Sequence, residues 1–251
     1  GVCHSPHMSD PLQMQVRPEL RDPALVLAFE GWNDAGEAAT RAVRYLGESL
    51  QMVSLARIDP EEFYDFTVQR PLVRLGEDSV RRIEWPSFEF QFGSLTSGSE
   101  IVIGVGAEPH LRWRTFCDQV MRLAGDLGVR RVVLLGAFLA DVLYSRPVRV
   151  TGFASAPELM EHFSIEPTGY EGPTGIVGVL ASRMREADIE TVSLWAGLPH
   201  YIAASPNARG VLALVTKLTQ VLDIRIDEGP LQRSAAEFEG RISEIVASDP
   251  A

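Results

Sequence analysis

Short apolar runs along the chain alternate with stretches in which apolar residues recur at helical spacing. The runs at 24–30, 52–58, 101–105, 131–135, 148–153 and 192–195 predict strands. The helical stripes predict helices over 36–50, 111–127, 157–163 and 207–222, and a further helix that GPTGIVG (172–178) opens. This alternation predicts one α/β domain over residues 8–228. We expect three layers, with helices on both faces of a mixed, largely parallel sheet.

Residues 60–98 depart from this rhythm. Prolines and glycines separate short β-like runs there, such as 81–85. We predict a β-rich antiparallel excursion or hairpin in this segment.

The C-terminal segment, residues 229–251, carries a different pattern. Pro230 is well placed to open a helix. Apolar residues then follow at alternating steps of four and three: Leu231, Ala235, Phe238, Ile242 and Ile245. Two arrangements fit this seam. The helix either lies back on its own core or serves as an oligomerisation arm on a neighbouring subunit.

Charge and composition exclude several classes of protein. The formal net charge is -11, whereas nucleic-acid binding needs a basic surface. The longest apolar runs, 101–107 and 132–140, are too short to cross a membrane. Only two cysteines are present, so we expect free thiols and a cytoplasmic location. Residues 1–7 precede Met8, and we interpret them as a leader before the native start.

The familiar cofactor and nucleophile motifs are incomplete. Gly104 and Gly106 supply two glycines of a dinucleotide fingerprint, but Pro109 stands where the third should be. The glycine-rich stretch 169–178 lacks the lysine of a phosphate loop, and G-x-S-x-G is absent. The histidines after residue 7 show no metal-ligand spacing. We therefore expect neither a cofactor nor a metal.

Polar residues nevertheless follow several predicted strands, at the place where open α/β sheets usually bind ligands. The candidates for catalysis are His110, Asp141 and His200. The candidates for ligand binding are Glu108, Tyr144, Arg146, Glu171 and Thr174. Capping and turn roles are the alternative for these residues, and Asp34 in GWNDAG is better explained as a helix cap.

Several stretches, taken in order, resemble the proteasome assembly chaperone 2 family in its actinobacterial branch. They are GWNDAGEAA (31–39), LLGAFLADVLYSRPVRVTGFAS (134–155), YEGPTGIVGVL (170–180), SLWAGLPHYIAASPN (193–207) and the helix at 208–222. The resemblance implies a phosphorylase/hydrolase-like α/β fold. It also implies a homotrimer, as bacterial members are described, and a link to proteasome assembly, in which eukaryotic and archaeal relatives take part.

Two departures from the family pattern bear on function. The branch usually reads Pro-His-Thr-Arg-Pro where this chain has Leu-Tyr-Ser-Arg-Pro at 143–147, so Tyr144 replaces a histidine that could act as acid or base. Archaeal relatives dock through a C-terminal hydrophobic–Tyr–any-residue tail. This chain reads Ser-Asp-Pro-Ala at 248–251, so that mode of docking is not expected.

The leading hypothesis is a non-enzymatic, chaperone-like homo-oligomer with proteasome subunits as candidate partners. The alternative is a small-molecule hydrolase or nucleoside-phosphorylase-like enzyme with its site at the strand ends. A third reading is a ligand-binding regulator that uses the same cleft without chemistry. Fold analogy alone does not decide among them.

Overall fold

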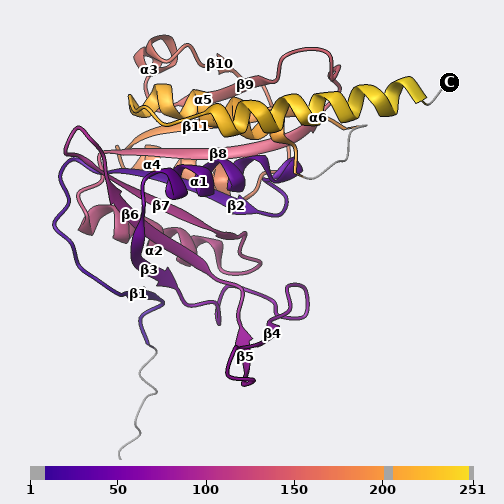
Figure 1. Ribbon diagram of the computed structural model, residues 1–251. Coiled ribbons are helices and arrows are strands. Elements are labelled where there is room, and N and C mark those ends of the chain that lie inside the picture. Colours follow the sequence, from indigo (N-terminus) through magenta and orange to yellow (C-terminus); the bar gives the residue numbers. More distant parts are fainter. Residues whose placement is uncertain (1–8, 201–205, 249–251) are drawn as a thin grey trace, which may run out of the picture.

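The computed structural model describes residues 9–200 and 206–248; the leader at 1–7 lies outside the described residues. Its centre is a nine-stranded mixed sheet (Figure 1). In spatial order the strands are β1 (Leu12–Met14), β3 (Val53–Ile58), β6 (Phe88–Ser94), β7 (Glu100–Ala107), β2 (Ala24–Glu30), β8 (Arg131–Ala140), β11 (Glu190–Pro199), β9 (Arg149–Ala154) and β10 (Glu166–Pro167). The four central strands, β7, β2, β8 and β11, are parallel. The predicted α/β class and the mixed, largely parallel sheet are confirmed.

Helices cover both faces of the sheet, because alternate residues of its strands point in opposite directions. In β2, Leu25, Leu27 and Phe29 pack in the same core as α2 (Trp113–Asp126) and α4 (Ile176–Glu186). Val26 and Ala28 pack in the other core, with α1 (Ala38–Ser49) and α5 (Ala208–Leu222). The short helices η1 (Ala35–Glu37) and α3 (Pro157–His162) lie in the connections. None of the helices in the described part of the chain is long and apolar enough to span a bilayer.

Two of the central strands extend further than the strands predicted for them. The runs at 131–135 and 192–195 mark only half of β8 and β11, which pair from Glu190↔Arg131 to Pro199↔Ala140. In the second half of β8, Phe138 and Leu139 are exposed, although the apolar run at 132–140 continues through them. The run at 148–153 was predicted as a strand and corresponds to β9, which lies antiparallel to β11.

The segment at 60–98 divides into two parts. Its last strand, β6, joins the main sheet antiparallel to both β3 and β7. Before it, β4 (Leu72–Leu75) and β5 (Arg81–Glu84) form a separate two-stranded hairpin, whose strand residues are all exposed. Figure 1 shows this hairpin standing away from the body of the molecule.

The C-terminal helix α6 (Gly229–Ser248) begins on the core and ends beyond it. It runs outside α5 and projects past the sheet (Figure 1). Four residues of its predicted seam are buried: Leu231, Ala235, Phe238 and Ile242. The fifth, Ile245, is 61% exposed. The helix therefore packs on its own core over most of its length, and its last turns leave that core.

Candidate functional site

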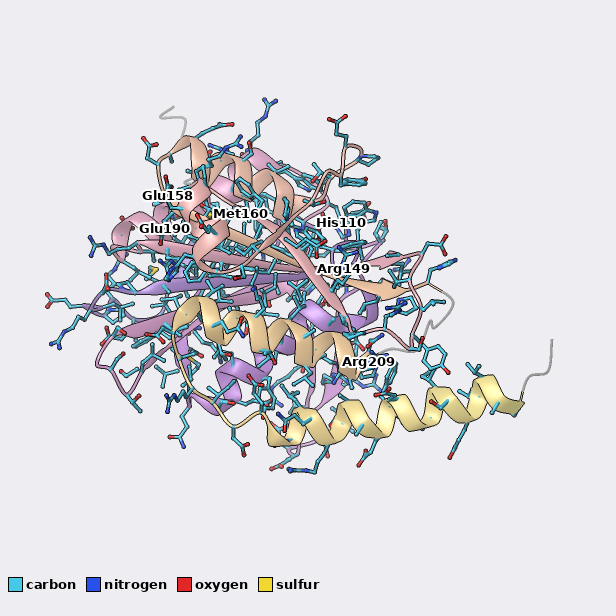
Figure 2. The ribbon with its side chains drawn as sticks, turned by 90° about the horizontal axis from the view of Figure 1, so that it is seen from above. His110, Arg149, Glu158, Met160, Glu190 and Arg209 are labelled. Atoms are coloured by element: carbon cyan, nitrogen blue, oxygen red, sulfur yellow. The ribbon has the colours of Figure 1, made fainter. Side chains whose placement is uncertain are left out.

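The carboxyl ends of β2, β7, β8 and β11 meet at one edge of the sheet, because these strands are parallel. We call the residues directly after them, 31–36, 108–112, 141–147 and 200, the strand-end edge. Figure 2 shows His110 and Arg209 toward this end of the molecule and Glu190, the first residue of β11, toward the opposite end. Most of the candidate residues predicted from the sequence lie on this edge.

After β2, Asp34 caps the first helix. Its Oδ1 accepts hydrogen bonds from the backbone N–H groups of Ala39 (2.8 Å) and Thr40 (3.1 Å). Its Oδ2 accepts one from Thr40 Oγ1 (2.5 Å). Burial raises the pKa of the Asp34 carboxyl, and the bonds from Thr40 and Ala39 oppose that shift. The predicted capping role is confirmed.

After β7, Glu108 caps a different helix from across the edge. Its Oε1 accepts a hydrogen bond from the backbone N–H of Ile176, the first residue of α4, at 2.9 Å. A carboxylate at a helix N-terminus is stabilised by the helix dipole. Glu108 was predicted to bind a ligand, and in the structure this oxygen holds the start of α4.

Beside this cap lies Asn33, which the sequence reasoning missed. Its side chain is fully buried, and neither Oδ1 nor Nδ2 has a hydrogen-bond partner among the described residues. The amide lies against Gly175, where an added Cβ would stand only 2.2 Å from Asn33 Oδ1. A buried amide without a bond is costly. The only signal for it in the sequence is its position next to Asp34 in GWNDAG.

His110 is engaged by the segment that follows β3. The Nδ1 of His110 accepts a hydrogen bond from the backbone N–H of Asp65 at 3.0 Å, and the backbone N–H of His110 donates to Phe63 O at 2.8 Å. Its ring meets Tyr64 edge-on at 5.8 Å, and the Tyr64 hydroxyl donates to Ala107 O at 2.6 Å. His110 therefore fastens residues 63–65 over the end of β7, with Nδ1 as an acceptor.

Asp141 and His200 come together on the surface after β8 and β11. Asp141 Oδ1 lies 3.8 Å from His200 Nδ1, with side-chain exposures of 100% and 55%. This distance is too long for a hydrogen bond. The strand ends bring the pair together, with the Asp141 side chain fully exposed.

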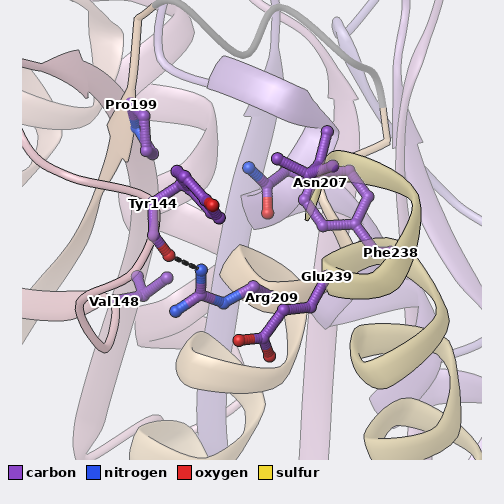
Figure 3. A pocket seen from close by; sticks show the side chains of 8 residues that line it. Tyr144, Val148, Pro199, Asn207, Arg209, Phe238 and Glu239 are labelled. Atoms are coloured by element: carbon purple, nitrogen blue, oxygen red, sulfur yellow. Dashed lines mark hydrogen bonds between the residues drawn. The ribbon is translucent and has the colours of Figure 1, made fainter. Parts of the chain in front are cut away.

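Tyr144 and Arg146 lie in the loop after β8, which α5 holds through Arg209. The Arg209 guanidinium donates to the backbone carbonyl of Tyr144 (Figure 3) and to that of Arg146, the latter at 2.6 Å. The crevice beside it has a volume of about 10 Å³. Its lining residues are Tyr144, Val148, Pro199, Asn207, Arg209, Phe238, Glu239 and Ile242. That is room for roughly one water.

Glu171 and Thr174 lie in the exposed loop before α4. The Thr174 side chain packs on the first turn of α4. Its Oγ1 lies 2.1 Å from the position that a Cβ atom would take if Gly178 carried one. Of the eight candidates, Tyr144 lines the crevice beside Arg209, together with none of the other seven. Two larger hollows, each of about 480 Å³, lie elsewhere, one at the opposite ends of the strands and one over the open face of β6 and β7.

Metal ions in proteins are bound by groups of side chains. Among residues 9–200 and 206–248, no group of three or more His, Cys, Asp or Glu side chains could hold an ion.

Comparison with known proteins decides the family. The PAC2 family model matches residues 28–246. The chain belongs to the PAC2 family. No curated protein matches it.

Two solved PAC2 structures are similar over nearly their whole length. A proteasome-assembly chaperone homologue from Mycobacterium tuberculosis is 40% identical, covering 90% of this chain and 97% of that chain, with a TM-score of 0.84. A PAC2 family protein from Streptomyces avermitilis is 41% identical, with the same coverage and a TM-score of 0.85. An archaeal proteasome activator from Pyrococcus furiosus shares the fold at 17% identity, covering 93% of this chain and 97% of that chain, with a TM-score of 0.73.

Proposed function

We propose that this PAC2 protein is a non-enzymatic, chaperone-like interaction protein that forms a homo-oligomer, with a trimer favoured, and binds proteasome subunits. Membership of the family supports the proposal. The similar protein from Mycobacterium tuberculosis is described as a proteasome-assembly chaperone homologue, and the archaeal one as a proteasome activator.

The observation that carries the proposal is the character of the strand-end edge. Large apolar side chains stand exposed at or beside it: Trp32 (59%), Phe138 (40%), Leu139 (55%) and Leu143 (61%). We call these four residues the apolar edge. Phe138 and Leu139 are consecutive in β8, so exposed apolar side chains stand on both faces of the sheet at this edge. Exposed apolar surface of this kind favours cover by a partner. Of the polar candidates beside them, Glu108 caps a helix and His110 holds backbone, so neither side chain is free to bind a small molecule. This favours a protein partner for the edge.

Capture of separated proteasome α and β subunits tests this proposal. The variant Leu139→Asp/Leu143→Asp places two charges on the apolar edge. If the edge binds a subunit, its affinity should fall at least tenfold, since removing a central apolar contact costs about 1–2 kcal/mol or more. Val16→Asp is the control, because Val16 is 44% exposed but lies away from the strand ends. Equal capture by both variants and the unaltered protein would argue against the edge as the binding surface.

The rival function, a hydrolase or phosphorylase-like enzyme, has one observation in its favour. Asp141 and His200 face each other at 3.8 Å at the strand ends, and a carboxylate beside a histidine is a common acid–base arrangement. Turnover of nucleosides or short peptides that disappears in His200→Ala would favour this function. Full exposure of Asp141 makes it the weaker proposal, because exposed groups gain little from electrostatic tuning.

A further inference from the structure

The β4–β5 hairpin has no hydrophobic layer to support it. It pairs only with itself, and all four residues of each strand are exposed. Phe66 and Trp85, whose rings lie 4.8 Å apart, anchor it at its base. An isolated two-stranded hairpin is only marginally stable in water. Contact with another chain, burying these apolar residues, would therefore stabilise the hairpin.

Three of the four exposed apolar residues in the hairpin strands share one face, and the fourth, Leu72, lies on the opposite face. Val73 pairs with Ile83, and Leu75 pairs with Arg81. Since alternate residues of a strand share a face, these four side chains stand together. We call them the hairpin face. Val73, Leu75 and Ile83 are 55%, 68% and 51% exposed.

The charges of the hairpin are not balanced on this face. On the opposite face Arg74 pairs with Glu84 at 3.1 Å, and Arg82 pairs with Asp78 at 2.6 Å. Among the described residues, the Arg81 guanidinium has no such partner. Residues 70–85 hold four arginines and three acidic residues, a net charge of +1 in a chain of net charge -11. The hairpin face is thus apolar with one uncompensated cation.

The end of α6 has the complementary character. Its seam is buried at Ile242 (7%) and continues into solvent at Ile245 (61%) and Val246 (47%). Residues 237–248 carry three glutamates and one arginine, a net charge of -2. We call residues 242–248 the helix tip. It is apolar, with Glu244 beside Ile245.

We propose that the helix tip of one copy packs on the hairpin face of a second copy. Ile245 and Val246 would cover Val73 and Ile83, while Glu244 would approach Arg81. The two surfaces cannot meet within one copy, because α6 and the hairpin lie on opposite sides of the sheet (Figure 1). This contact rests on the homo-oligomer in the proposed function and names the surfaces that build it.

Such a contact joins two different surfaces, so it is head-to-tail. Repeated about an axis it closes a ring, for which a trimer is one solution. A hairpin packing on a hairpin, or a tip on a tip, would instead give a two-fold dimer. Cross-links between the hairpin and the tip indicate the ring, whereas cross-links between two hairpins or two tips indicate the two-fold dimer.

Cysteine pairs test the contact directly. In a Cys3→Ser background, Ile83→Cys and Ile245→Cys chains are co-expressed with different tags and oxidised. Cys117 stays silent, because it is fully buried and burial raises the pKa of its thiol to about 12. We expect covalent pairs only between the two variants, and a ladder up to the ring size when both changes are in one chain. Val16→Cys in place of Ile83→Cys should give none.

Other cross-linking results would overturn the contact. Linkage of Ile83→Cys to itself would mean that hairpins meet, and linkage of Ile245→Cys to itself would mean that tips meet. No linkage in a protein that sediments as an oligomer would refute the contact and leave the homo-oligomer standing. A monomer at all concentrations would refute both, whereas capture of proteasome subunits is scored separately.

A charge exchange provides the second measurement. Arg81→Glu and Glu244→Arg should each weaken self-association roughly tenfold in sedimentation velocity, because each places like charges face to face. The two changes together should restore it. Equal weakening in the double variant would refute the pairing of Arg81 with Glu244.

Discussion

Removing the Asp34 carboxylate should destabilise the fold by an amount that the structure allows us to work out. Asp34→Ala deletes the acceptor of two backbone N–H groups at the start of α1, and the loss of such a cap costs about 1 kcal/mol. It also leaves the fully buried hydroxyl of Thr40 without its hydrogen-bond acceptor, at a further cost of about 1–3 kcal/mol. The free energy of unfolding should therefore fall by about 2–4 kcal/mol.

Urea denaturation followed by far-UV circular dichroism measures this loss. Asp34→Asn is the matched control, because its side-chain oxygen can still accept both backbone bonds, and it should lose less than about 1 kcal/mol at pH 7. A loss below about 0.5 kcal/mol for Asp34→Ala would refute the reasoning, since neither the cap nor the buried hydroxyl would then depend on the carboxylate.

The difference in unfolding free energy between the unaltered protein and Asp34→Asn should depend on pH, in a direction that the structure predicts. Burial raises the pKa of Asp34 in the folded protein, so the folded state binds this proton more tightly than the unfolded chain does. Stability from this group is thus greatest in acid and falls as the pH rises from the usual aspartate pKa through the folded one. Asp34→Asn does not titrate there. Its stability relative to the unaltered protein should therefore rise as the pH is raised above about 4. An opposite trend would mean that hydrogen bonding outweighs burial.

Three further perturbations follow from the site. Asn33→Leu replaces an unbonded buried amide with an apolar group of similar shape, and we expect a gain of about 1 kcal/mol in unfolding free energy; a loss would mean that the amide is satisfied in solution. Arg209→Ala should speed amide hydrogen exchange in residues 141–147 and cost about 1–3 kcal/mol, with Arg209→Lys recovering part of it; unchanged exchange would contradict the clamp. In the Cys3→Ser protein, Cys117 should react with a thiol reagent at pH 8 only as the chain unfolds, because its pKa is raised to about 12, and rapid reaction of the folded protein would refute its burial.

The spacing of apolar residues predicted strands and helices well wherever one face of the element is buried. The apolar run at 24–30 and the stripe at 207–222 correspond to β2 and α5, which pack in the cores. It could not give the direction of β9 or the place of β6, because strand pairing is set by partners distant in the chain. The strand predicted at 131–135 also stopped short of the second half of β8, where Phe138 and Leu139 are exposed and pairing with β11 continues.

The candidate site was predicted less completely for a similar reason. Asp34 was identified as a cap because its bonds are local, to residues five and six positions on. Arg209 reaches carbonyls more than sixty residues away, and His110 accepts from Asp65, so only the folded chain reveals either contact. The exposed apolar residues of the strand-end edge and of the hairpin likewise resemble core residues in the sequence. Their exposure is visible only in three dimensions.

Native mass spectrometry of the purified protein, alone and mixed with separated proteasome α and β subunits from the same source, tests the proposed function most directly. We predict a homo-oligomer, with a trimer favoured, that captures subunits and is released once the core particle matures. An oligomer or monomer that never binds either subunit, under conditions in which the subunits assemble, would contradict the proposed function.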